Sequence, residues 1–76
     1  GDWDLALEIW SELARGNQVE ATEHLAKYYE HRAGDVVRAR EFTERLLGLE
    51  PDRPAHGQRA ARLDGKLARR RAALGA

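Results

Sequence analysis

Few side chains in this sequence have a type and spacing that could do chemistry. His24 and His31 are seven residues apart and would share one side of a helix, but no H-E-x-x-H zinc motif includes them. Ser11 is the sole serine, and no triad pattern of histidine and carboxylate surrounds it. We expect the histidines to be exposed polar residues on helix surfaces, so the sequence predicts no metal site.

Acidic pairs are equally uninformative about catalysis. Glu20 with Glu23, and Glu41 with Glu44, have a spacing of three residues that could imitate an acid–base dyad. On helices such pairs normally decorate a solvated face and bind lysine or arginine. No phosphate-loop sequence G-x-x-x-x-G-K-[ST] occurs. We therefore predict no catalytic residue, no cofactor and no small-molecule substrate, and we expect the chain not to be an enzyme.

Charge is divided unevenly between the two parts of the chain. Residues 1–50 carry six Lys/Arg and eleven Asp/Glu, whereas residues 51–76 carry seven and two, so the total is zero. This asymmetry raises the question of a charged partner. The absence of cysteine fits a cytoplasmic protein, and the short apolar runs exclude a membrane span. Because the chain starts with Gly1 and not Met, we expect a fragment of a longer protein.

Turn and capping residues divide the sequence into helices. The predicted helices are residues 2–15, 17–33, 35–48 and 54–74. Asp2, Asn17 and Asp35 are placed to cap the first three, and Glu20 would complete a capping box with Asn17. No strand-like alternation occurs. The sequence thus predicts an all-α fold.

The apolar stripes of the first two helices are wide. On a helical wheel they cover roughly 160° and roughly 180° of the circumference, more than contact with a single neighbour needs. Wide stripes indicate helices that touch neighbours on two sides, as in a stacked array.

An internal repeat appears when the chain is shifted by 33 residues. The matched positions are Gly1 with Gly34, Asp2 with Asp35, Ala6 with Ala39, Glu8 with Glu41 and Leu13 with Leu46. They include the turn glycine, the capping aspartate and a small residue suited to close helix packing. A period of this size is typical of helical-hairpin repeats.

This repeat resembles the tetratricopeptide repeat. The second-helix pattern is carried by Gly34-Asp35, Ala39, Thr43 and Leu46, with Pro51 at the closing position, and the first-helix pattern by Leu25-Ala26 and Tyr29. Two departures occur. The stretch from Tyr29 to Gly34 is one residue longer than the usual spacing, and Thr43 replaces a large apolar residue.

The resemblance implies a four-helix αα-hairpin array, a fragment of a right-handed tetratricopeptide-like superhelix. We expect one domain over residues 1–76. Residues 1–16 would be a half repeat, residues 17–49 a complete repeat and residues 54–74 a closing basic helix.

A second resemblance is narrower. Residues 25–32, followed by a helix that starts with aspartate, look like the helical C-terminal region of bacterial YprB-type proteins, and the similarity covers residues 2–50. Those proteins carry a ribonuclease-H-like exonuclease domain upstream. Its metal-binding carboxylate motifs do not occur here, so the resemblance implies an accessory domain and transfers no catalytic residue.

The half repeat suggests where a partner would bind. Without its missing helix, the first helix would expose apolar side chains, and such a patch marks an interface. The candidate interface residues are Trp3, Leu7, Trp10 and Tyr28. The partner would be another domain of a longer bacterial protein, or a second copy of the chain. Ordinary packing between helices is the alternative interpretation of these aromatic residues.

The last helix offers a second candidate surface. Its basic residues Arg59, Arg62, Lys66, Arg69 and Arg70 fall within about 100° of arc, beside a leucine seam. They could contact nucleic-acid phosphates or an acidic protein, or simply keep a terminal helix soluble. We therefore predict a non-catalytic protein–protein interaction or scaffolding module. The alternative is an accessory nucleic-acid-binding domain of a bacterial nuclease.

Overall fold

The computed structural model describes residues 2–75, apart from the side chain of Asp2. The elements are α1 (Asp2–Arg15), α2 (Val19–Lys27), the π-helical segment η1 (Tyr28–Arg32), α3 (Val36–Leu49) and α4 (Pro54–Gly75). No strand occurs between residues 2 and 75, so the predicted all-α class is confirmed. No helix in this range combines the length and the apolar composition that a membrane crossing requires.

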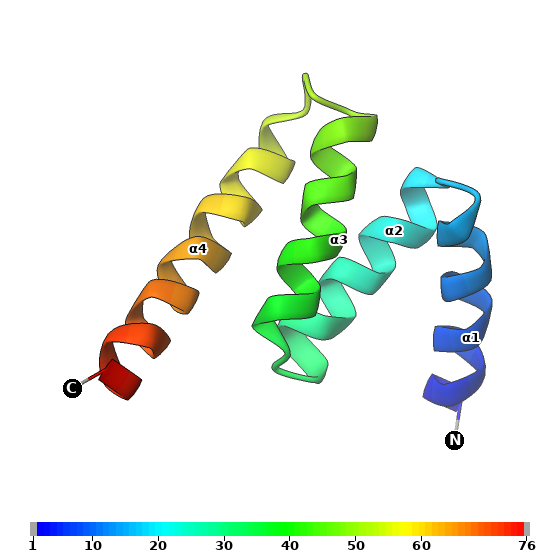
Figure 1. The fold of residues 1–76 in the computed structure, drawn as a ribbon. Coiled ribbons are helices and arrows are strands. Elements are labelled where there is room, and N and C mark those ends of the chain that lie inside the picture. Colours follow the sequence, from blue (N-terminus) through cyan, green and yellow to red (C-terminus); the bar gives the residue numbers. More distant parts are fainter. Residues whose placement is uncertain (1, 76) are drawn as a thin grey trace.

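The helices form a thin array in chain order. Backbone contacts join α1 to α2, α2 to α3 and α3 to α4, while α1 and α4 lie at opposite ends (Figure 1). The Cα atoms extend over 40 × 35 × 15 Å. Each helix therefore buries its apolar face mainly against its neighbours in the chain.

The turn between α1 and α2 differs from the prediction. Asn17 has φ of +60°, and α2 begins only at Val19 with Gln18 in the N-cap position. An N-cap residue needs an extended backbone, which Asn17 does not have. Instead Asn17 closes α1, and its N–H donates to the carbonyl oxygen of Ala14 at 2.9 Å. Asparagine tolerates this left-handed position, so it ends the first helix and does not cap the second.

The turn before α3 follows the prediction. Gly34 has φ of +66°, and the Asp35 side chain accepts a hydrogen bond from the backbone N–H of Arg38 at 3.1 Å. Glycine supplies the left-handed conformation without strain, and the carboxylate satisfies a free N–H of the first turn.

The segment Tyr28–Arg32 forms one π-helical turn that continues α2. The N–H of Ala33 donates to the carbonyl oxygen of Tyr28, five residues back, at 3.0 Å. This is the stretch in which the sequence has one residue more than the tetratricopeptide spacing. A π turn accommodates an extra residue without breaking the helix.

Buried side chains lie along the whole array, at each contact between successive helices. Leu25 of α2, Leu46 of α3 and Leu63 of α4 are fully buried, as is Ala39. Thr43, the second departure from the repeat pattern, is also fully buried, and its hydroxyl donates to the carbonyl oxygen of Ala39 at 2.8 Å. This hydrogen bond satisfies the hydroxyl within its own helix, so a small polar residue is tolerated at the contact.

Replacement by alanine should have opposite effects on the stability of the fold at Gly57 and at Gly34. Gly57 lies exposed in α4, and no atom lies within 4 Å of the position that an alanine Cβ would occupy, so Gly57→Ala should stabilise the fold by about 0.5–1 kcal/mol. Gly34→Ala should destabilise it by about 1–2 kcal/mol, because φ of +66° strains any residue with a Cβ. Urea denaturation of both variants checks this, and a gain of stability from Gly34→Ala would contradict the turn geometry.

Candidate functional site

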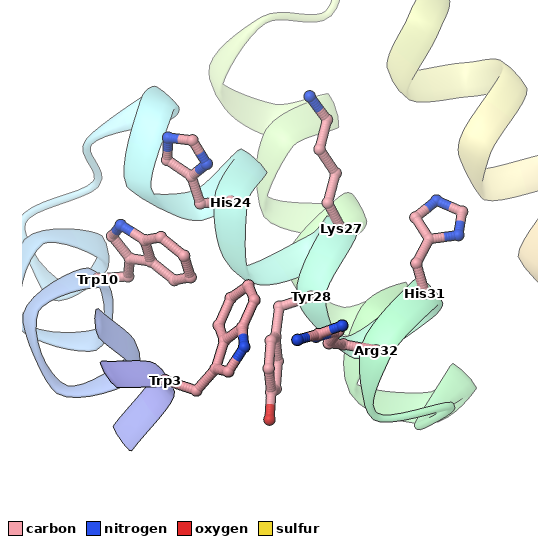
Figure 2. Close-up of a pocket in the computed structure, with 7 residues that line it drawn as sticks. All are labelled: Trp3, Trp10, His24, Lys27, Tyr28, His31 and Arg32. Atoms are coloured by element: carbon pink, nitrogen blue, oxygen red, sulfur yellow. The ribbon is translucent and has the colours of Figure 1, made fainter. Parts of the chain in front are cut away.

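An open recess lies between α1 and the continuous helix formed by α2 and η1 (Figure 2). Its volume is about 220 Å³, and it is lined by Trp3, Trp10, His24, Lys27, Tyr28, His31 and Arg32. Of the predicted interface residues, Trp3, Trp10 and Tyr28 are thus brought together in one place. Among the side chains that the structure describes, none of those lining the recess carries a carboxylate.

The aromatic rings of the recess pack against one another. The Trp3 centroid lies 6.1 Å from that of Trp10, with the rings at 65°, and 5.3 Å from that of Tyr28. Trp10 stacks on the His24 imidazole, with centroids 4.9 Å apart and the rings inclined by 14°. Edge-to-face and offset contacts of this kind are the favoured arrangements of aromatic pairs. The rings form a fixed apolar wall, although Trp3 stays 43% exposed.

Cationic side chains surround this wall. The Arg32 guanidinium lies over the Trp3 ring, 4.7 Å from its centroid. Lys27 also lines the recess and forms an ion pair at 3.4 Å with Glu23, which does not line it. For Arg32, no carboxylate among the described side chains lies within ion-pair distance. The recess therefore combines an aromatic wall with a positively charged rim.

Sequence reasoning missed the polar and basic side chains of this recess. His24, Lys27, His31 and Arg32 follow one another at intervals of three, four and one residues, and Tyr28 lies among them. Helical spacing of three and four places side chains on one face, so the signal was present in the second helix.

Leu7 is placed differently from its predicted partners in the interface. It is half-buried and packs against the core cluster of Ala14, Ala21 and Leu25, and it does not line the recess. It lies on the side of α1 that faces α2, where an apolar side chain is covered within the chain. Leu7 therefore contributes to packing and not to the recess.

The predicted basic stripe of α4 is divided into two groups. Arg62, Lys66 and Arg59 converge on Glu30 of η1, whose side chain is fully buried. Arg62 donates from Nε and Nη2 to the two carboxylate oxygens at 2.7 and 2.8 Å, a bidentate pair. Lys66 Nζ lies at 3.4 Å and Arg59 Nε at 3.9 Å from the carboxylate.

The charge of Glu30 is held by these cations. Hydrogen bonds from Arg62 lower the pKa of Glu30 to about 2, although burial alone would raise it. Arg59 is itself nearly buried, and its Nε and Nη1 have no hydrogen-bond partner among the described residues. The Glu30 carboxylate is therefore the charge that compensates a buried guanidinium. These three basic residues join α4 to η1.

Arg69 and Arg70 form the second group. Both are exposed near the end of α4, and among the side chains described no carboxylate pairs with either. Of the predicted basic stripe, Arg69 and Arg70 are thus the residues whose charge faces solvent without an ion pair to a described side chain.

The third histidine, His56, contributes to packing and to a contact between α4 and the preceding loop. His56 is buried in the first turn of α4, and its Nε2 lies 2.8 Å from Oε1 of Glu50. Hydrogen bonds from His56 and Arg53 lower the pKa of Glu50. This contact ties the proline-containing loop to α4. Within the described part of the chain, no group of three His, Asp or Glu side chains is arranged to hold a metal ion.

Comparisons of this chain with protein-family models, with curated protein sequences and with solved structures find no match. The resemblances to tetratricopeptide repeats and to the YprB-type region therefore stay predictions that rest on the residues themselves.

The low pKa of Glu30 predicts an acid-dependent loss of stability. Its folded pKa of about 2 lies below the ordinary value of 4.5, so its contribution is complete above pH 4.5 and is lost as the pH falls towards 2. We expect about 1–3 kcal/mol, less than for a fully buried pair, because Arg62 and Lys66 are partly exposed. Urea denaturation across this pH range measures the change.

Glu30→Gln is the variant that assigns this loss to one carboxylate. At pH 7 it should cost about 1–3 kcal/mol, since the cations lose their counter-charge, and its stability should depend less on pH. Glu20→Gln, at a side chain that is 91% exposed, is the matched control and should change little. Equal pH profiles for Glu30→Gln and the unmodified chain would contradict the assignment.

Proposed function

We propose that this chain is a tetratricopeptide-like, non-catalytic interaction module that binds an acidic segment of a partner protein in the recess between α1 and α2–η1. The observation that carries the proposal is the lining of the recess: an aromatic wall with Lys27 and Arg32 at its rim, and no carboxylate among the described side chains that line it. Tryptophan, tyrosine and arginine are also the side chains in which interface binding energy is concentrated.

The size of the recess favours a segment of a protein over a metabolite. Its volume of about 220 Å³ is below the range of about 300–1,000 Å³ that pockets for drug-sized ligands occupy. One large side chain fits a space of this size. An apolar side chain of the partner would contact the rings, and neighbouring acidic residues would face Arg32 and Lys27. Charge complementarity of this kind also speeds the encounter of the partners.

The aromatic rings give less support to the binding of single-stranded nucleic acid. Base stacking needs an open ring face. One face of Trp10 is covered by His24, and the Arg32 guanidinium lies over Trp3. On α4, three of the five predicted phosphate contacts already pair with Glu30. The nucleic-acid alternative therefore depends on Arg69 and Arg70.

Tryptophan fluorescence can test the proposal directly. Both tryptophans of the chain line the recess, so their emission reports its occupancy. The probe is a short peptide with a central phenylalanine between glutamates, compared with the same peptide carrying lysines and with an oligothymidine strand. We expect the acidic peptide to bind, and increasing salt to weaken it by screening.

Arg32→Glu should weaken this binding by about tenfold, or roughly 1.4 kcal/mol, because it reverses a charge at the rim. Arg69→Glu makes the same charge change far from the recess and should leave peptide affinity unchanged. Circular dichroism confirms that both variants fold. Absence of acidic-peptide binding at low salt would refute the proposal, as would binding of the oligothymidine strand that Arg69→Glu abolishes.

A further inference from the structure

The outward side of α1 carries an uncovered apolar stripe. Leu5, Ile9 and Leu13 are spaced four residues apart and are 61%, 49% and 38% exposed. Side chains at this spacing line up along one face of a helix. Within the described chain, α1 has backbone contacts with α2 alone, so no other helix covers this stripe. Leu5 and Ile9 lie apart from the recess, which α1 lines with Trp3 and Trp10, whereas Leu13 at the end of the stripe also borders the start of α2.

An acidic row runs beside this stripe. Asp4, Glu8 and Glu12 are also spaced by four residues, and all are exposed. Glu8 lies three residues after Leu5, and Glu12 three residues after Ile9, a spacing that makes them neighbours on the helix surface, offset by about 60°. The row therefore follows one edge of the apolar stripe. The outer face of α1 is therefore an apolar ridge with a negative border.

The opposite end of the array carries a surface of the reverse charge. An open groove of about 260 Å³ between the start of α3 and the end of α4 is lined by Val37, Leu67, Arg70, Arg71 and Leu74. Val37 is 50% and Leu74 82% exposed. Within residues 2–75, the lining has apolar side chains and two arginines but no carboxylate. We call this surface the α3–α4 groove.

We propose that the outer face of α1 docks into the α3–α4 groove of a second copy of this chain. Both surfaces are apolar, and their charged borders are of opposite sign. Their lengths also correspond, because Leu5 to Leu13 spans about 12 Å of helix and Leu67 to Leu74 about 10 Å. Within one molecule the two surfaces cannot meet, since α1 and α4 lie at opposite ends of the array (Figure 1).

A second copy is favoured over an unrelated partner because one chain carries both complementary surfaces. The asymmetry of charge, eleven Asp/Glu against six Lys/Arg in residues 1–50 and two against seven in residues 51–76, has the sign that such a contact requires. A contact between two different surfaces is heterologous, and each molecule added head to tail leaves one surface of each kind free.

Sedimentation velocity over a concentration series tests this contact. We expect association that increases with protein concentration and decreases with salt, because the charged borders are exposed. Glu8→Arg with Glu12→Arg should suppress association, and so should Arg70→Glu with Arg71→Glu. A mixture of these two double variants should associate again, because each reversed border now meets a reversed counterpart.

Asp52→Arg, an exposed charge reversal in the loop between α3 and α4, is the control that should leave association unchanged. Ile9→Gln should weaken association at all salt concentrations, because it removes apolar contact. Thermal denaturation followed by circular dichroism shows whether each variant folds. A chain that stays monomeric at every concentration overturns the proposal, as does association that the charge reversals leave intact.

Discussion

The position of α4 depends on the ion pairs between its basic side chains and Glu30. By backbone contact α4 touches only α3, whereas Arg59, Arg62 and Lys66 reach across to the π-helical turn at the end of α2. An ionised carboxylate in a buried position is costly unless cations and hydrogen-bond donors surround it. The hairpin and the closing helix are therefore coupled, because separating them would leave charges on both sides uncompensated.

The π turn η1 relates this cluster to the recess. A π turn takes up more residues than an α turn. Glu30 faces α4 from the middle of the turn, while Tyr28 and Arg32 at its two ends line the recess beside α1. The π turn thus contributes side chains both to the contact with α4 and to the recess beside α1.

Local signals in the sequence are sufficient to predict the helices, but they do not predict the contacts between helices. Gly34 and Asp35 specify their turn by backbone freedom and capping, and the burial of Leu46 follows from helical period. Asn17 was assigned to the wrong helix because the same residue type suits an N-cap and a left-handed helix end. The cations of α4 form one arc on a helical wheel, yet their common partner lies about thirty residues earlier. No periodicity within a single helix reveals such a partner.

The division of these cations also changes what the charge asymmetry of the sequence means. Glu30 neutralises the inner part of α4, so the free positive charge is concentrated at Arg69, Arg70 and Arg71 near the end of the helix. The carboxylates of Asp4, Glu8 and Glu12 likewise form an exposed row on α1. A chain of zero net charge can then present strong local potentials of both signs at its two ends. Because screened electrostatic interactions act over about 8–10 Å, such terminal patches influence an approaching surface far more than the net charge does.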